Sequence, residues 1–317
     1  MRMGQIHYKV GDRIKRRYRV VSTHQGFLGL VYICKRKAAG EKPVYAAIKT
    51  FRSDDRIRRD LFEKELANWV RLTPHPNVVQ AIDADTKEKL LVLEFVYGPT
   101  LKGVASRSPV HSVHLVPWAR QIAAGLRFLH VDNRFVHRDL RPANILIDIR
   151  NDLRAKISDL GIGKPLNPDA TSHTMIGTHA YMAPEVHQGR TDFRSDIFCY
   201  GATIYYLLTG RSVARVTTKR MDTVTSPRHF APDVSETLER LTLKCVERDP
   251  DRRYRSMDEV LEALDDVAEW SMRPVPFEHC SRHAYFYFSG STGRGCPFCR
   301  YERDFESREH ELERKRT

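Results

Sequence analysis

The sequence predicts an α+β fold, in which an antiparallel sheet with one helix is followed by a mainly helical region. Short runs rich in Val, Ile and Tyr lie at residues 18–23, 30–35 and 44–50. Glycine-containing connections separate them, as in an antiparallel meander. Beyond residue 100 the apolar residues recur at helical spacing instead. The Tyr97-Gly98-Pro99 segment between the two regions is typical of a turn.

The other elements follow from the same kind of pattern. Residues 60–72 are expected to form the helix of the N-terminal region, since Leu66 and Trp69 belong to an apolar series at helical spacing. Prolines at positions 74 and 76 end that helix. Residues 90–96 form an apolar run that predicts a strand before the turn. The first long helix after the turn is expected to place on one face Trp118, Ile122, Leu126 and Leu129.

Length and composition indicate a globular protein. With 317 residues, 41% of them hydrophobic, the chain can bury a sizeable core. The longest apolar run, residues 197–208, is shorter than the ~18 residues of a membrane-spanning helix. The N-terminal residues also lack the apolar stretch of a signal peptide, so we expect a cytoplasmic protein. Cys34, Cys199 and Cys245 lie singly in apolar segments and are expected to be buried thiols.

Positive charge is concentrated near the N-terminus. The formal net charge is +13, and residues 1–60 contain 16 Lys or Arg against five Asp or Glu. Clusters at residues 15–19 and 56–59 are compatible with an anionic partner, such as nucleic acid, an acidic protein or a membrane surface. The alternative is a solvated basic face that serves solubility.

The strongest chemical signal is the segment VHRDLRPANIL at residues 136–146. It places the carboxylate of Asp139 five residues before the amide of Asn144. Such a pair suits phosphoryl transfer, because a carboxylate can orient an attacking hydroxyl and accept its proton while an amide oxygen holds magnesium against nucleotide phosphates. The segment SDLG at residues 158–161 supplies a second carboxylate, that of Asp159, beside a glycine.

Two further motifs lie before and after these two segments. The segment AAIK at residues 46–49 places Lys49 on a predicted strand, and GTHAYMAPE at residues 177–185 ends in Ala-Pro-Glu. In their order along the chain, the four motifs resemble those of eukaryotic-type, or Hanks-type, serine/threonine protein kinases. The resemblance implies a bilobal protein-kinase-like fold, with an antiparallel sheet and one helix in the N-lobe and a mainly helical C-lobe.

The resemblance also implies a reaction, namely ATP-dependent transfer of the γ-phosphate to Ser or Thr hydroxyls of protein substrates, with ATP and Mg²⁺ as cofactors. Asp139 would be the catalytic carboxylate, and Asn144 and Asp159 would hold Mg²⁺. Lys49 would contact the nucleotide phosphates, and Arg141, where the family usually has lysine, would contact the transferred phosphate. The residues implied at the ATP site are Gly26, Gly29, Val31, Ala47, Lys49, Glu65, Glu94 and Val96.

Ion pairs are implied in both lobes. Glu65 is expected to hold Lys49, and Glu63, two residues away on another face of the helix, is the competing candidate. In the C-lobe, Asp196 of an SDIFCYG segment would brace the catalytic loop. By the same resemblance, Arg253 would pair with Glu185.

Two positions depart from the family pattern. His24 stands where the glycine-rich loop usually has its first glycine, and Leu160 replaces the usual phenylalanine after the metal-binding aspartate. These departures keep an alternative open: a pseudokinase scaffold, or an adaptor that binds nucleic acid or another partner. The polar residues that the chemistry needs are all present, which favours an active enzyme.

The segment before residue 177 carries candidate regulatory hydroxyls. We expect autophosphorylation at one or more of Thr171, Ser172 and Thr174. Arg138, next to the catalytic aspartate, could bind such a phosphate through charge-assisted hydrogen bonds.

A second signal follows the kinase-like region. Cys280, His283, Cys296 and Cys299 form a C-x₂-H and a C-x₂-C pair, a ligand set that suits a structural tetrahedral Zn²⁺. His279 is an alternative ligand. The aromatic residues 285–288 between the pairs suit either a small core or stacking on single-stranded nucleic acid. The expected domains are an N-lobe at 1–97, a C-lobe at 98–272, a zinc-binding module at 273–300 and a charged tail helix at 301–317, either solvated or used for docking.

Overall fold

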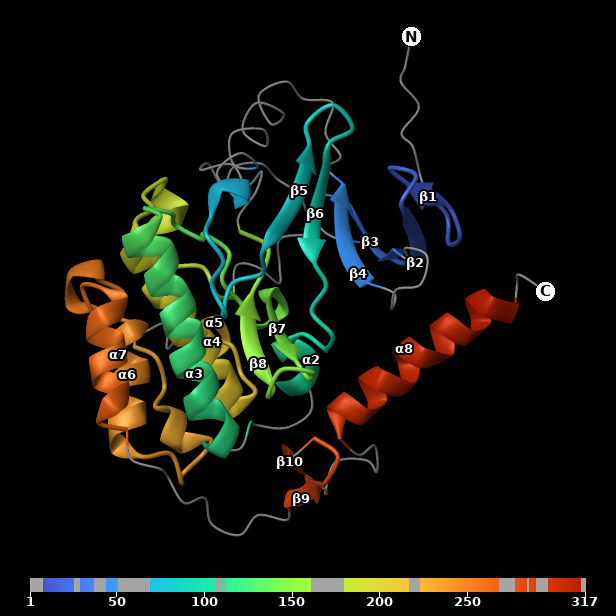
Figure 1. Cartoon of the computed structure of the whole chain (residues 1–317). Helices are drawn as coiled ribbons and strands as arrows, with labels where there is room; N and C mark the ends of the chain where they lie inside the picture. Colours follow the sequence, from blue (N-terminus) through green and yellow to red (C-terminus); the bar gives the residue numbers. More distant parts are fainter. Residues whose placement is uncertain are drawn as a thin grey trace. The chain divides into compact units, whose positions relative to one another are not determined.

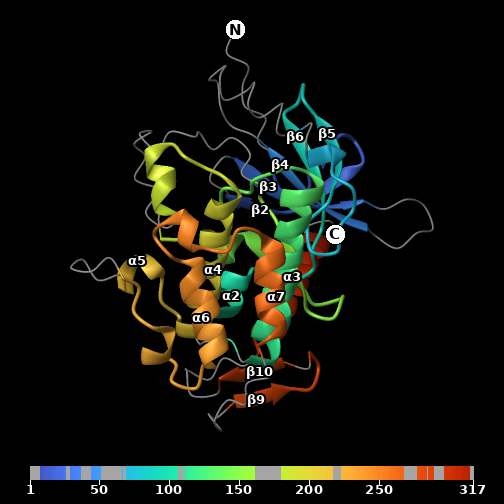
Figure 2. The same cartoon turned by 90° about the vertical axis from the view of Figure 1, so that its left-hand side faces the viewer.

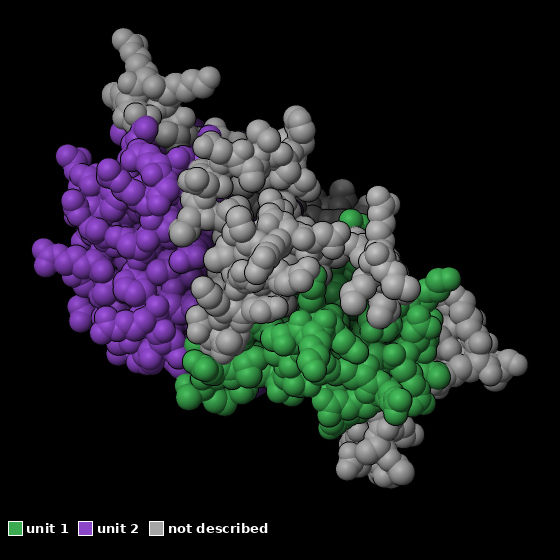
Figure 3. Space-filling view, turned by 90° about the horizontal axis from the view of Figure 1, so that it is seen from above, with its two compact units in different colours: residues 1–74, 79–96, 301–317 green, residues 75–78, 97–300 purple. Residues whose placement is uncertain are grey.

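The computed structural model divides into two compact units, shown in different colours in Figure 3. Unit 1 comprises Met1–Pro74, Val79–Val96 and Tyr301–Thr317, and unit 2 comprises His75–Val78 and Tyr97–Arg300. Within these bounds the structure describes residues 8–25, 29–36, 44–50, 66, 69–105, 110, 112–160, 180–216, 223–267, 277–283, 285–288 and 296–314.

A six-stranded antiparallel sheet forms the body of unit 1 (Figure 1). The strands lie in the order β1-β2-β3-β4-β6-β5. Their bounds are β1 (Arg13–Ile14), β2 (Tyr18–Gln25), β3 (Leu30–Arg36), β4 (Val44–Thr50), β5 (Ala81–Asp85) and β6 (Leu90–Glu94). The meander predicted from the three Val-, Ile- and Tyr-rich runs is confirmed, since β2, β3 and β4 pair as antiparallel neighbours.

Alternation along the strands builds the core of this sheet. Tyr32 and Cys34 of β3 are buried together with Ala46 and Ile48 of β4, at the period of two that places alternate side chains on one face. The helix expected at residues 60–72 is described only in part, and its described residues 66 and 69–71 are helical. Trp69 of that helix is buried and donates a hydrogen bond from Nε1 to the Val79 carbonyl, at 3.2 Å.

Unit 2 is mainly helical, as Figure 2 shows. Its helices up to residue 267 are α2 (Leu101–Ala105), α3 (Ser112–Arg127), α4 (Phe193–Thr209), α5 (Val213–Val216), α6 (Glu236–Cys245) and α7 (Met257–Asp265). A π-helical turn, η1 (Phe128–Asp132), continues α3. Short 3₁₀ turns are η2 (Pro142–Asn144), η4 (Pro184–Gln188), η5 (Pro227–His229) and η6 (Pro250–Arg252). The predicted apolar face is confirmed, because Trp118, Ile122 and Leu126 of α3 and Leu129 of η1 are all buried.

A short hairpin of β7 (Ile145–Asp148) and β8 (Arg154–Ile157) lies between the helices in the sequence. The predicted turn contacts this hairpin, since the Pro99 and Tyr97 carbonyls accept hydrogen bonds from the backbone N–H groups of Ile147 and Ile149. Glycine is required at position 98, since a Cβ there would lie 1.7 Å from the Ile147 carbonyl oxygen. The α+β prediction is therefore confirmed, with a sheet-based unit and a helical unit.

The C-terminal part adds β9 (Phe277–Cys280), β10 (Tyr285–Phe288) and the long helix α8 (Pro297–Arg314). β9 and β10 pair as antiparallel strands. α8 begins in unit 2 and continues in unit 1 from Tyr301 onward. Among the described residues, no helix combines the length and apolar composition that a membrane crossing requires.

Candidate functional site

The loop before β7 is ordered by one buried carboxylate. Asp196, in the first turn of α4, accepts hydrogen bonds from the backbone N–H groups of His137 (2.6 Å) and Arg138 (2.8 Å). His130 of η1 contacts the same carboxylate through Nε2, at 2.9 Å. Burial raises the pKa of Asp196, but the contacts with His130 and His137 outweigh burial and hold that pKa below its usual value. The expected bracing role of Asp196 is confirmed.

His137 connects this loop to the strand end at Ser158. Its Nε2 lies 3.0 Å from the Ser158 carbonyl oxygen, and its Nδ1 lies 3.2 Å from the backbone N–H of Asp139. Because a carbonyl can only accept and a backbone N–H can only donate, the ring proton belongs on Nε2. His137 is fully buried, so the ring fixes the position of the Asp139 backbone.

Asp139 and Asn144 face each other across the loop. The Asn144 Nδ2 donates to the backbone carbonyl of Asp139 (2.8 Å) and to its Oδ2 (2.7 Å). The Arg141 Nε lies 3.5 Å from the same Oδ2. Asp139 and Asn144 are buried, with 6% and 2% of their surface exposed. The structure therefore brings together three of the predicted residues, and the Asn144 amide oxygen is the atom that it can offer to a cation.

Asp159 directly follows Ser158, which is hydrogen-bonded to this loop. Ser158 donates to the Asn144 carbonyl from its backbone N–H (2.8 Å) and from its Oγ (3.0 Å). Asp159 has a φ of 57°, a left-handed conformation that is uncommon for a residue with a Cβ. Such conformations persist only where the surroundings impose them, and they cluster at functional sites. Leu160 next to it is fully buried.

The carboxylate of the Ala-Pro-Glu motif is held by a buried arginine. Arg253 donates from Nη1 to Glu185 Oε1 (2.7 Å) and from Nη2 to Oε2 (2.8 Å). Ser195 Oγ adds a third hydrogen bond to Oε1, at 2.8 Å. The predicted pairing of Arg253 with Glu185 is confirmed.

Unit 1 carries the predicted nucleotide residues on its strands. Lys49 of β4 lies opposite Val31 of β3 in register, and Ala47 lies two residues before Lys49. Glu94 ends β6 and accepts a hydrogen bond at Oε1 from the Gln80 backbone N–H, at 2.9 Å. Gly29 must be glycine, since a Cβ would lie 1.9 Å from the Thr50 carbonyl oxygen.

Several predicted residues lie outside the described part of the chain. They are Gly26 of the glycine-rich loop, Glu63 and Glu65 of the expected helix, and the hydroxyls of Thr171, Ser172 and Thr174. The contacts expected of these residues stay predictions.

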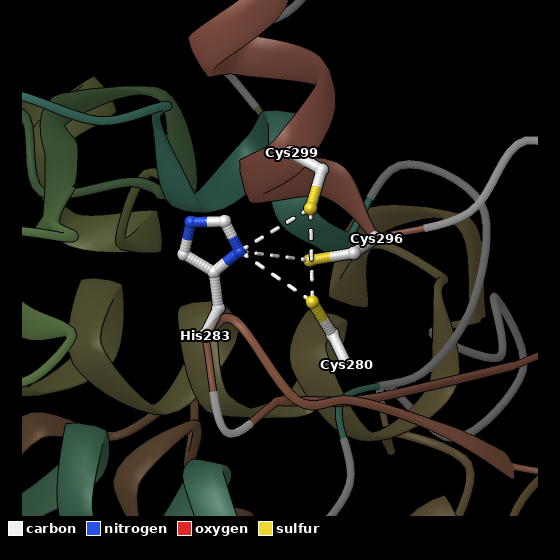
Figure 4. Close-up of side chains that lie close together, drawn as sticks. All are labelled: Cys280, His283, Cys296 and Cys299. Carbon is white, nitrogen blue, oxygen red and sulfur yellow. Dashed lines mark hydrogen bonds between the residues drawn. The ribbon is translucent and has the colours of Figure 1, made fainter.

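The four predicted metal ligands form one cluster, shown in Figure 4. The His283 Nδ1 lies 3.5 Å from the sulfur of Cys280, 3.7 Å from that of Cys296 and 3.4 Å from that of Cys299. The Cys280 and Cys299 sulfurs are 3.6 Å apart. A tetrahedral ion with metal–sulfur bonds of ~2.3 Å would separate its ligand atoms by roughly 3.6–3.8 Å. The cluster therefore has the dimensions of a tetrahedral metal site, and it contains His283 rather than His279.

Aromatic contacts attach this cluster to α3. Tyr285 of β10 is buried and stacks on His114, with ring centroids 4.6 Å apart, and more loosely on Trp118 at 6.1 Å. Phe298, between two of the cysteines, meets Tyr285 edge to face and is fully buried. Tyr285 is thus a core residue, which agrees with the small-core interpretation of the aromatic segment 285–288.

Sequence reasoning missed the contact of His130 with Asp196 and the aromatic face through which α8 docks. A histidine on an apolar helix face carries little signal, because most such residues are simply packed in a core. The docking of α8 had a signal in Tyr301 and Phe305, which lie four residues apart and therefore share a helix face.

Comparisons with known proteins agree with this geometry. Residues 23–264 match the family model of the protein kinase domain. The serine/threonine-protein kinase PrkC of Bacillus subtilis is 30% identical over 79% of this chain and 40% of its own length. PknB of Mycolicibacterium smegmatis, also a serine/threonine-protein kinase, is 31% identical over 73% of this chain and 40% of its own length.

The chain spans at most two fifths of the length of these relatives, and only 33% of a probable serine/threonine-protein kinase of Clostridium acetobutylicum. Among solved structures, the kinase domain of Mycobacterium tuberculosis PknI gives a TM-score of 0.64 at 21% identity. The match covers 82% of this chain and 99% of that one, which establishes a common fold.

Proposed function

Because the chain belongs to the protein kinase family, we propose that it transfers the γ-phosphoryl group of ATP to serine or threonine hydroxyls of protein substrates. The specificity named for its relatives supports this substrate class. The observation that carries the proposal is the hydrogen-bonded pair of Asp139 and Asn144, on a loop that Asp196 holds by two backbone N–H groups.

In this proposal the loop works by positioning and charge. The Asp139 carboxylate orients the acceptor hydroxyl and takes its proton, and Arg141 beside it provides positive charge for the transferred group. Asn144 and Asp159 offer oxygen ligands of the kind that Mg²⁺ prefers. Mg²⁺, when bound, would neutralise charge on the nucleotide phosphates. Hydrogen bonding of the Asn144 Nδ2 to Asp139 fixes the amide, so that its Oδ1 would serve as the ligand for Mg²⁺.

The strands of unit 1 are proposed to hold the nucleotide. Lys49 would bind its phosphates, with Val31, Ala47 and the segment from Glu94 to Val96 around the base. The register that sets Val31 opposite Lys49 supports this assignment. Two further parts of the proposal come from the sequence alone: Gly26 would contact the phosphates, and Glu65 would hold Lys49.

The test is phosphate transfer from γ-labelled ATP in the presence of magnesium. We expect labelled phosphoserine or phosphothreonine with the parent protein and none with Asp159→Asn. Nucleotide binding without any transfer by the parent would favour the pseudokinase scaffold. Phosphopeptide mapping of the same reaction tests autophosphorylation, which we expect at Thr171, Ser172 or Thr174. Mapping in which all three stay unmodified would contradict that expectation.

We also propose that the Cys280–His283–Cys296–Cys299 cluster holds a structural Zn²⁺. Three sulfurs and one imidazole nitrogen form a closed tetrahedral set, with no position left for a substrate. The Cys280 and Cys299 sulfurs are 3.6 Å apart, far more than the ~2.05 Å of a disulfide. The ligands come from a strand end, a turn and the start of α8, so a metal would join all three.

Metal analysis of the purified chain tests the zinc proposal. We expect about one zinc per chain, in keeping with a single four-ligand site. The paired substitution Cys296→Ser and Cys299→Ser should abolish zinc retention, whereas Cys34→Ser, at a buried cysteine of the sheet, should leave it intact. Metal retained by the double variant would contradict the assignment.

An anionic partner for the basic N-terminal segment and a cytoplasmic location stay predictions. Two members of the basic cluster already have acidic neighbours in the sheet. Lys15 lies 3.0 Å from Asp83 and 3.4 Å from Asp85, and Arg17 lies 3.1 Å from Asp83. This local neutralisation favours the solvated-face interpretation for that cluster.

A further inference from the structure

Helix α8 presents one face to the strands of unit 1. Tyr301, Phe305 and Glu309 are spaced by four residues and so lie along a single face of the helix. Phe305 is buried, with 9% of its surface exposed, whereas its neighbours Glu306 and Ser307 are exposed. The helix is therefore docked through this face within unit 1.

Three aromatic rings form the centre of the docking contact. Phe305 meets Tyr45 of β4 edge to face at 5.5 Å, and stacks on Phe95 at 5.6 Å. Tyr45 and Phe95 also contact each other, with centroids 5.5 Å apart. Tyr301 extends the cluster by stacking on Phe305 at 6.1 Å. Ring pairs of this kind stabilise a contact beyond the burial of their surface.

Polar contacts fix the next turn of the helix. The Glu309 carboxylate pairs with the Lys35 ammonium at 3.1 Å and accepts a hydrogen bond from the Tyr45 hydroxyl. The Lys35 Nζ also lies 5.8 Å from the centre of the Tyr45 ring. Tyr45 thus contacts α8 through both its ring and its hydroxyl, which sets the rotation of the helix about its axis.

The strand residues in this contact adjoin the proposed nucleotide site. Ala46 and Ile48 of β4 point into the core, so Tyr45, Ala47 and Lys49 share the opposite face of the strand. Phe95 lies between Glu94 and Val96 in the sequence. α8 therefore covers one end of the strand face that carries Ala47 and Lys49, and it holds the side chain at the centre of the 94–96 segment.

The first turn of the same helix carries the metal cluster. Cys299 lies in that turn and Cys296 directly precedes it. The Arg300 backbone N–H donates to the Cys296 carbonyl at 3.2 Å, so the cysteine segment is part of the helical hydrogen bonding. α8 is continuous from Pro297 to Arg314, so a metal at the cluster would hold the first turn of the same helix that presents Phe305.

We propose that α8 is a positioning element for the nucleotide site of its own chain, anchored by the metal cluster. Phe305 holds Tyr45 and Phe95 and thereby keeps the β4 face and the 94–96 segment in the arrangement that binds ATP. Loss of the metal releases the start of α8 and weakens this contact. The proposal rests on the proposed function, since it concerns the affinity of that site for ATP.

The first test compares Phe305→Ala with Ser307→Ala in the full chain. Both substitutions introduce alanine, which favours helix, so α8 itself is preserved. ATP affinity is measured by titration with a fluorescent ATP analogue and competition by ATP, and kcat and the KM for ATP by phosphate transfer. We expect Phe305→Ala to weaken ATP binding roughly fivefold or more, the lower end of ordinary site-to-site coupling, and to raise KM more than it lowers kcat. Phe305→Leu should restore part of the affinity, and Ser307→Ala should match the parent.

Hydrogen exchange separates this mechanism from a general loss of stability. In Phe305→Ala the amides of residues 44–50 and 94–96 should exchange faster, while those of α4 and α6 keep their protection. A parent that binds no ATP would refute the proposed function. A parent and a Phe305→Ala variant that bind ATP equally would overturn the positioning role.

The second test removes the metal with a zinc-selective chelator while magnesium stays in excess. The metal-free parent should lose ATP affinity to the level of Phe305→Ala, and readdition of zinc should restore it. Phe305→Ala itself should lose little more on chelation, because the two changes act through one contact. Unchanged ATP affinity after proven metal loss would overturn the anchoring role of the cluster.

Discussion

Asp139 and Asn144 act as a pair because one short loop holds them in hydrogen-bonding contact. That loop is in turn held by Asp196, His130 and His137. The contribution of His130 could not be predicted, since its partner, the Asp196 carboxylate, lies 66 residues further along the chain. Arg253 and Glu185 could be paired only through the family resemblance, because 68 residues separate them.

The Glu185–Arg253 pair gives a prediction for stability. Burial raises the pKa of Glu185, but the hydrogen bonds and charge of Arg253, a backbone hydrogen bond and the Ser195 hydroxyl together outweigh burial and hold the pKa below its usual value. Glu185→Gln leaves a guanidinium whose side chain is 0% exposed without its carboxylate, which should cost on the order of 3 kcal/mol of unfolding free energy at pH 7. Urea unfolding measures this cost.

The pH dependence of that difference follows from the lowered pKa. A carboxylate with a depressed folded-state pKa stabilises the protein above its unfolded pKa, and the contribution is lost as pH falls through the folded value. The gap between parent and Glu185→Gln should therefore be constant above about pH 5 and shrink below it. Glu236→Gln is the control, since Glu236 pairs with Arg228 at 3.2 Å but its side chain is 81% exposed. Its effect should stay below about 1 kcal/mol. Equal effects of both variants at pH 7 would contradict the assignment.

At the scale of elements, strands that bury one face were predictable and strands held by pairing were not. β2, β3, β4 and β6 are rich in β-branched and apolar residues. β5 (AIDAD) has little β-propensity and forms because its backbone pairs with β6 and its aspartates bind Lys15 and Arg17. α8 begins four residues before the expected helix at 301–317, because the C-x₂-C segment itself enters the helix.

The contact between α4 and α6 gives a prediction for one glycine. A Cβ at Gly201 would lie 2.4 Å from the Cys245 Cβ, which is closer than such atoms can approach. Gly201→Ala should therefore destabilise the protein by about 1–3 kcal/mol despite the helix propensity of alanine. Gly103→Ala in α2, where the nearest atom is 3.6 Å away, should be neutral or stabilising. Chemical denaturation distinguishes them, and a Gly201→Ala variant as stable as Gly103→Ala would show that the helices separate without cost.

For the whole molecule, the sequence was sufficient for the fold class and for several residues that meet at each candidate site, Asp139 with Asn144 and the Cys280–His283–Cys296–Cys299 cluster. The sequence did not decide the role of the C-terminal helix. Its alternating charges are equally compatible with a solvated helix and with a docking helix. Tyr45, Phe95 and Phe305 are 50 and 210 residues apart along the chain, and no local pattern relates such positions. Long-range packing of this kind is decided by the tertiary structure.

The central claim is that Asp139 serves phosphoryl transfer on a preorganised loop. The most direct measurement is kcat for phosphate transfer at saturating ATP, compared between the parent, Asp139→Asn and Asp152→Asn. Asp152 is exposed at a turn with φ 50°, a conformation that asparagine adopts well, so it is a matched control. We predict that Asp139→Asn lowers kcat by about 10²- to 10⁴-fold with little change in ATP affinity, while Asp152→Asn equals the parent. Undiminished kcat in folded Asp139→Asn would contradict the account.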